Sequence, residues 1–224
     1  HSLENELLTY LQSFLTPRRV ALFEKVLRQR TQHLTVAVED VYQLHNTSAV
    51  IRSCESFGIQ QLHVIEEVNT KRIDREIAMG AQKWVDVARH SSAQDCISHL
   101  REQGYRIVAT TPHKKAYPLS EFDISTKAAI FFGRETQGLS DVVLEQADDY
   151  IYIPTVGFTE SLNISVSAAI TLQHLGSKLK ASEVDWQLSD VDYFNKQMEW
   201  TKKMIKDADS IIERWKKTSK STKY

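Results

Sequence analysis

Apolar and polar positions along the chain follow two periods in turn, one typical of strands and one typical of helices. Short apolar runs, as in buried strands, lie at residues 34–38, 61–65, 84–88, 105–110, 128–132 and 150–153. Between them, apolar residues recur every three or four positions, which predicts amphipathic helices. The clearest of these stripes lie within residues 50–57, 93–103 and 164–180. Strands that alternate with helices predict an α/β fold, a mostly parallel sheet with helices on both faces.

The two ends of the chain carry helical patterns only. Val20, Phe23 and Leu27 are spaced as one face of a helix near the start. Near the end, a single apolar stripe predicts one long amphipathic helix that contains Trp200 and Trp215. Two tryptophans on one stripe need a surface to pack on, either the body of this chain or a second subunit.

Length and composition are those of one α/β domain with extra helices. The chain has 224 residues, 42% hydrophobic and 25% charged, and no apolar run approaches the roughly 20 residues of a membrane span. It opens without a basic-then-apolar signal segment, and its two cysteines form no CxxC pair. We therefore expect a cytoplasmic protein with no membrane partner. Its expected parts are an N-terminal helical extension (1–32), an α/β domain (33–180) and a C-terminal helical extension (181–224).

Charge is balanced overall but gathers in two places. The net charge is −1, which argues against a protein that binds nucleic acid through bulk positive charge. One basic segment near the start contains Arg18, Arg19, Arg28 and Arg30, and residues 214–224 carry five basic residues and no acid. Such clusters suit a locally docked anionic partner, but charge alone favours the simpler explanation of two solvated helix faces.

Two glycine-containing turns stand out, because each follows an apolar strand and leads into a helix. They are residues 133–140 and 153–163. Turns at the carboxyl ends of parallel strands are where open α/β sheets bind ligands, so we expect one shared pocket. Glu135 in the first turn can accept ligand hydrogen bonds or complement a helix dipole. Ser161 and Asn163 in the second are good helix caps or ligand-binding groups.

Other kinds of site find little support. Neither turn is a GxGxxG or Walker sequence, and no GxSxG elbow is present. The histidines form no pair with metal-ligand spacing, so we expect no metal. Asn46 is placed to be the N-cap of the helix that follows it. Arg52 lies about one and a half turns further along, and Arg52 with Glu55 is compatible with a simple ion pair on the surface of that helix.

Three segments together resemble the motifs of the SPOUT-superfamily RNA 2′-O-ribose methyltransferases, in particular the tRNA (guanosine-2′-O-)-methyltransferase (TrmH) branch. In chain order they are residues 45–54 (HNTSAVIRSC), 132–140 (FGRETQGLS), and 153–157 (IPTVG) with 161–166 (SLNISV). The similarity extends from about Arg18 to about Lys180. Short helical extensions also resemble the tRNA branch, whereas the related ribosomal RNA enzymes usually carry a separate N-terminal domain.

The resemblance implies features that no periodicity indicates. The C-terminal part of the sheet would be threaded into a deep trefoil knot, and the protein would be a homodimer. The cofactor S-adenosylmethionine would lie in the knot, and the residues expected to bind it are Thr110, Gly133, Glu135, Ile153, Ser161, Leu162 and Asn163. The implied reaction is methylation of a ribose 2′-hydroxyl in RNA, most typically a guanosine of the tRNA D-loop. A ribosomal RNA methyltransferase and a non-catalytic RNA-binding protein of the same fold are the alternatives.

The resemblance also assigns roles to the catalytic residues. It gives the central step to Arg52, and because a guanidinium rarely loses its proton, we expect Arg52 to grip a phosphate and stabilise the developing alkoxide. Asn46 would orient the site and Glu135 would hold the catalytic loop and the ligand. Ser161 and Asn163 would shape the cofactor loop. If the partner is RNA, the four arginines near the start become candidate phosphate contacts.

Overall fold

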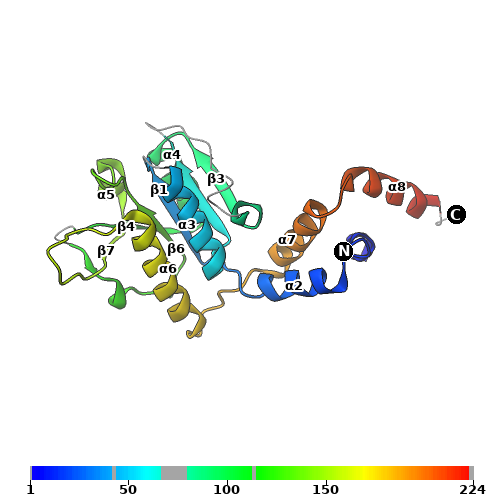
Figure 1. Ribbon diagram of the computed structural model, residues 1–224, viewed down its shortest axis with the longest axis horizontal. Helices are drawn as coiled ribbons and strands as arrows, with labels where there is room; N and C mark the ends of the chain where they lie inside the picture. Colours follow the sequence, from blue (N-terminus) through cyan, green and yellow to red (C-terminus); the bar gives the residue numbers. More distant parts are fainter. Residues whose placement is uncertain (1, 42–43, 67–79, 113–114, 222–224) are drawn as a thin grey trace. The chain divides into compact units, whose positions relative to one another are not determined.

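The computed structural model describes residues 2–41, 44–66, 80–112 and 115–221. The chain forms two compact units (Figure 1). The α/β unit comprises residues 31–187, and the helical unit comprises residues 1–30 together with 188–224.

The α/β unit is built on a seven-stranded sheet in which every neighbouring pair of strands is parallel. The strand order is β3-β2-β1-β6-β4-β7-β5. The strands are β1 (Leu34–Glu39), β2 (Gln61–Ile65), β3 (Asp86–His90), β4 (Arg106–Thr110), β5 (Tyr117–Pro118), β6 (Ala128–Phe132) and β7 (Asp149–Tyr152). Every residue of the adjacent strands β1 and β6 is buried, as expected for the centre of a parallel sheet with both faces covered.

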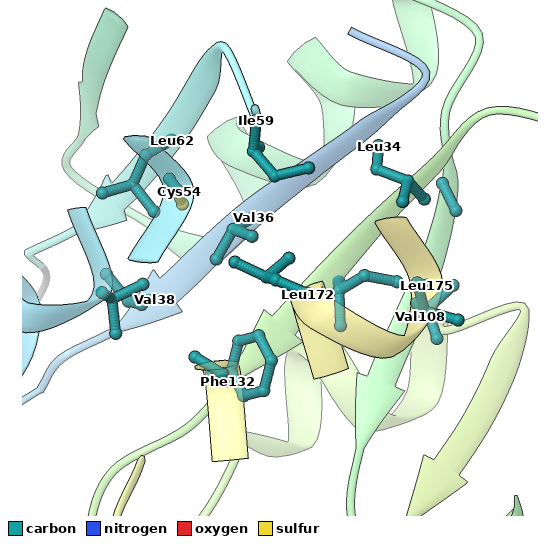
Figure 2. Close-up of a cluster of buried hydrophobic side chains, with 14 of the residues drawn as sticks. Leu34, Val36, Val38, Cys54, Ile59, Leu62, Val108, Phe132, Leu172 and Leu175 are labelled. Carbon is teal, nitrogen blue, oxygen red and sulfur yellow. The ribbon is translucent and has the colours of Figure 1, made fainter. Parts of the chain in front are cut away.

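Helices cover the two faces of this sheet. They are α3 (Leu44–Phe57), α4 (Ala93–Glu102), α5 (Asp141–Gln146) and α6 (Ile164–Lys180), with short 3-10 turns η1 (Ala81–Lys83) and η2 (Leu119–Glu121). Residues of α3 and α6 form one apolar core with the strand side chains that point toward these helices (Figure 2). This core includes Val36 of β1 and Leu172 and Leu175 of α6. Residues of α4 and α5 pack in a second core against the alternate set of strand side chains.

The helical unit contains α1 (Ser2–Gln12), α2 (Pro17–Leu27), α7 (Asp190–Lys203) and α8 (Ala208–Ser221). Its largest fully buried side chain is Trp200 of α7. The Trp200 ring meets Phe23 of α2 edge-on at 5.7 Å between centroids, and the Arg30 guanidinium lies 5.5 Å from its centroid. Trp215 of α8 stacks on Tyr10 of α1. No helix in the described part of the chain is long and apolar enough to cross a membrane.

The structure corrects the sequence-based expectations at three places. The prediction of a single long C-terminal helix is wrong, because α7 and α8 are separated at residues 204–207, where Asp207 has a φ of 56°. The two-residue strand β5 was not expected. Asn46 is not an N-cap, since α3 already begins at Leu44. The α/β class with a parallel sheet is confirmed.

Candidate functional site

A short chain of side-chain hydrogen bonds joins three segments that are far apart in the sequence. The Asn46 Nδ2 group donates to Glu135 Oε1 at 2.8 Å, and the Asn163 Nδ2 group donates to Asn46 Oδ1 at 3.2 Å. Asn46 is 1% exposed, whereas Glu135 and Asn163 are exposed. A buried amide that both donates and accepts is well satisfied, so Asn46 fixes the two turns relative to α3. We call Asn46, Glu135 and Asn163 the amide relay.

The first turn is closed by its own backbone. Arg134 and Gly138 exchange hydrogen bonds, with N···O distances of 3.0 and 3.1 Å. Gly138 has a φ of +68°, a left-handed conformation that favours glycine. A Cβ atom on Gly133 would lie 2.3 Å from the carbonyl carbon of Gly138. Both glycines are therefore required for this turn to close after β6.

Two buried carboxylates at the end of β1 hold the same turn from outside. Asp40 accepts a hydrogen bond from Arg134 Nη2 at 3.2 Å, and Glu39 accepts from the Ser140 backbone N–H at 2.8 Å and from the Ser140 hydroxyl. Both carboxylates are at most 1% exposed. Buried carboxylates are stable only when paired in this way. Sequence reasoning missed this pair, although two successive acids at the end of an apolar strand are a signal that could have been used.

The second turn lies at the start of α6. Asn163 caps this helix, because its Oδ1 accepts from the Ser165 backbone N–H at 2.8 Å. The same amide reaches Asn46, so capping and site assembly are combined in one residue. Ser161 is exposed and has no hydrogen bond with the described residues around it. The whole stretch 154–163 is exposed, and the side chains of Val156 and Phe158 are fully so.

The remaining expected cofactor residues surround these turns. Thr110 ends β4, and its hydroxyl donates to the Phe131 carbonyl of β6 at 2.6 Å. Ile153 follows β7 and is half-buried, and Leu162 is 39% exposed. The carboxyl ends of β4, β6 and β7, which are neighbours in the sheet, therefore supply this set.

Arg52 stands apart from the amide relay. It is exposed on α3 and has no hydrogen bond or ion pair with other residues of the described ranges. Arg52 follows Asn46 by six residues, about one and two-thirds helical turns, so the two side chains leave α3 in different directions. Within one chain, Arg52 makes no hydrogen bond or ion pair with Glu135 or Asn163.

The four candidate RNA-binding arginines differ in exposure. Arg18 and Arg28 are exposed and Arg19 is partly exposed. Arg30 is 1% exposed, beside the Trp200 ring. A guanidinium buried in this way is not available to a phosphate, so its burial removes Arg30 from the candidate set.

Comparisons with known proteins agree on one family. Residues 33–173 match the family described as SpoU rRNA Methylase. A protein from Borreliella burgdorferi named tRNA (guanosine(18)-2′-O)-methyltransferase is 38% identical over 197 residues, which cover 88% of this chain and 90% of that protein. A protein of the same name from Thermus thermophilus is 33% identical over 190 residues, 84% of this chain and 98% of that protein.

Solved structures show the same fold. The A. aeolicus TrmH/SpoU tRNA modifying enzyme superposes with a TM-score of 0.74 at 28% identity, covering 84% of this chain and 98% of the other. The SpoU methyltransferase AviRb from Streptomyces viridochromogenes, solved in complex with the cofactor AdoMet, superposes with a TM-score of 0.62 at 20% identity. That alignment covers 70% of this chain and 65% of AviRb.

Proposed function

Because the chain belongs to the SpoU rRNA Methylase family, we propose that it transfers a methyl group from S-adenosylmethionine to the ribose 2′-hydroxyl of guanosine 18 in tRNA. The similar proteins that carry this activity in their names match this chain over most of their own length. A relative named as a 23S rRNA (guanosine-2′-O-)-methyltransferase is 29% identical and covers 66% of this chain. The longer and stronger matches favour tRNA over ribosomal RNA.

The single observation that carries a catalytic role is the amide relay. A protein that only held RNA would have no need for a buried Asn46 that ties two exposed turns together at the carboxyl edge of the sheet. Positioning of this kind is what a displacement reaction requires, because its rate depends on alignment of donor and acceptor.

The residues at this edge fit S-adenosylmethionine. The turn at 133–138 and the exposed stretch 154–163 offer backbone N–H and C=O groups to the polar edges of an adenine ring and an amino acid. Leu162 and Ile153 offer apolar surface for the flat ring, and the Glu135 carboxylate is an acceptor for hydroxyl or ammonium groups. When bound, this cofactor supplies a methyl group on a positively charged sulfur. Thr110, Gly133, Glu135, Ile153, Ser161, Leu162 and Asn163 are the residues proposed to hold it.

The chain's own residues then prepare the acceptor. A ribose hydroxyl must lose its proton as it attacks, and this proton passes to solvent water. A guanidinium stabilises the resulting negative charge without leaving its own protonated form. Arg52 therefore binds the phosphate next to the ribose and stabilises the developing alkoxide. Asn46 and Glu135 keep the first turn in place, and Asn163 and Ser161 shape the second.

A homodimer completes this proposal. Arg52 is exposed on α3 and makes no hydrogen bond or ion pair with the amide relay within one chain, and a second subunit is the means by which it can join the site of its partner. We propose the trefoil knot because of the family to which the chain belongs. It is supported by the path of the chain, which leaves β7 near one edge and returns as α6 to pack beside α3.

Transcripts that differ at one ribose test the function. Transfer of labelled methyl from S-adenosylmethionine to a tRNA transcript is expected, and it should vanish when guanosine 18 is replaced by 2′-deoxyguanosine. A 2′-deoxyguanosine at position 19 is the matched control and should leave transfer intact. Methylation of a 23S ribosomal RNA fragment instead of tRNA would favour the ribosomal alternative. Tight RNA binding without any transfer would favour the non-catalytic one.

A further inference from the structure

Four side chains that the methyl transfer does not use gather on the face of the sheet covered by α4. They are His63 of β2, His90 of β3, and Cys96 and His99 of α4. Leu62 and Val64 belong to the core under α3 and α6, so the alternation of β2 sends His63 to the opposite face. In the register between strands, Ala88 of β3 lies opposite His63, and His90 follows two residues later on the same face.

Three of these side chains, His63, His90 and Cys96, are close enough to share one ion. The His63 Nδ1 and His90 Nε2 atoms lie 2.9 Å apart. A nitrogen from each of these rings and the Cys96 sulfur all lie within 4.8 Å of one another. The His99 ring is centred 5.9 Å from that of His63 and 5.5 Å from that of His90. Cys96 and His99 are three residues apart on α4, a spacing that places both on one helix face.

The centre of the cluster contains a polar atom that lacks a partner. His63 is fully buried, and its Nε2 has no hydrogen bond with any residue in the described ranges. Its other nitrogen shares a single hydrogen bond with His90. Buried polar atoms in folded proteins are nearly always satisfied, so this ring has a coordination position to fill.

We propose that His63, His90 and Cys96 bind a zinc ion, with His99 as the fourth ligand. Imidazole and thiolate are the ligands that zinc takes in closed tetrahedral sites. Bond lengths of about 2.0–2.3 Å place tetrahedral ligand atoms about 3.3–3.7 Å apart. The two histidine nitrogens, now 2.9 Å apart, therefore move apart slightly on binding, and the wider separations, up to 4.8 Å, shorten. Zinc binds cysteine as the thiolate, so the thiol proton of Cys96 is released to solvent when the ion binds.

The role of this site is structural and separate from methyl transfer. The ligands come from β2, from the edge strand β3 and from α4, so one ion joins three elements that otherwise meet through side-chain packing. The sheet separates the cluster from α3, which contains Arg52, and from α6, which Asn163 caps. His90 and His99 are only partly buried, which leaves a route for the ion to enter. Sequence reasoning overlooked the cluster because the two strand histidines are 27 residues apart.

Metal titration of the tag-free, metal-depleted full chain tests the proposal. Cobalt(II) should give a thiolate-to-metal charge-transfer band and the intense visible bands of tetrahedral coordination, and zinc should abolish both at one equivalent per chain. Zinc at about 100 times its Kd should raise the Tm by about 5–10 °C. A parent chain without the charge-transfer band, or with no zinc-dependent rise in Tm, overturns the site. Binding of copper(I) but not zinc overturns the assignment of the metal.

Variants identify the ligands. Cys96→Ser should eliminate the charge-transfer band, whereas Cys54→Ser should retain it, because Cys54 is equally buried but lies in the other core (Figure 2). His90→Asn, at the partly exposed rim, should weaken zinc binding by at least about 10-fold, and His174→Asn on α6 should not. Circular dichroism of each metal-free variant establishes that it is folded. An unchanged band in folded Cys96→Ser, or unchanged zinc affinity in folded His90→Asn, contradicts the proposal.

Discussion

Single residues in this site do more than one task, and Asn46 is the clearest case. Its amide is buried within the first turn of α3, yet both of its polar atoms bond to turns that lie 89 and 117 residues further along the chain. The sequence pattern suggests a helix cap at this position, because Asn is a common cap and long-range partners leave no local trace. The three motif segments predict which turns form the site, but not that one side chain joins them.

A double-mutant cycle measures the first link of the amide relay. Asn46→Ala and Glu135→Ala should each slow methyl transfer. The free energies of unfolding of the single and double variants should show a coupling of about 0.5–3 kcal/mol, because the two side chains share a hydrogen bond. Replacing Asn46 and Ser161 together is the control, and these effects should add. A coupling of zero between Asn46 and Glu135 would show that the bond does not contribute in solution.

The proposed role of Arg52 is tested by a substitution that keeps the positive charge but loses the planar guanidinium group. Arg52→Lys loses the planar fork that can bind phosphate and alkoxide together, so kcat should fall by at least about 100-fold. The affinity for S-adenosylmethionine, measured by calorimetry, should hardly change. Arg101→Lys, an exposed arginine on α4, is the matched control and should retain full activity. Normal turnover of Arg52→Lys would remove Arg52 from the mechanism.

At the level of helices and strands, the sequence is a good guide wherever burial decides the pattern. The strands β2 and β6 and the helix α6 begin and end where the apolar runs predict. The strand β5 escapes prediction because it is two residues long and contains Pro118, so no alternation can develop. The break between α7 and α8 is invisible for another reason. The apolar stripe keeps its spacing through residues 204–207, although none of these four residues is helical and Asp207 has a positive φ.

The glycine turn after β6 provides a prediction about an element. Gly133→Ala places a Cβ against the backbone of Gly138, which no rotamer change can relieve, so unfolding should become easier by about 1–3 kcal/mol. Affinity for S-adenosylmethionine should fall with it. In Gly157→Ala, the nearest atom to the new Cβ is 3.9 Å away, so thermal unfolding of this control should match the parent. Equal melting of both variants would contradict the close packing of the turn.

At the level of the whole molecule, the first 30 residues and the last 37 residues form one unit although they lie at opposite ends of the sequence. Trp200 is one of the residues that join them, since it contacts Phe23 and Arg30. Trp200→Ala should destabilise the helical unit by about 3–5 kcal/mol. Trp215→Ala should have a smaller effect, because Trp215 is only partly buried. Chemical unfolding followed by circular dichroism compares them, and equal losses would contradict this ranking.

The exposed arginines of the helical unit provide a prediction about RNA. If Arg18 and Arg28 contact phosphates, the double alanine variant should reduce the slope of log affinity against log salt by about 0.7–0.9 for each contact. Affinity for S-adenosylmethionine should stay unchanged. Arg101→Ala serves as the control in the α/β unit. A slope that is identical in the double variant and the parent would mean that the RNA docks elsewhere.

The strand order has a consequence for how the protein is made. On one side β1 pairs with β2, which follows it closely, but on the other it pairs with β6, so Leu34 meets Ala128. During synthesis on the ribosome, β1 and β2 emerge long before β6, and one edge of a strand that is fully buried in the folded protein stays open in the meantime. Such an edge is a template for pairing with other chains. The nascent protein is therefore most prone to aggregate in the middle of its translation, and a chaperone that shields this edge should raise the yield of active enzyme.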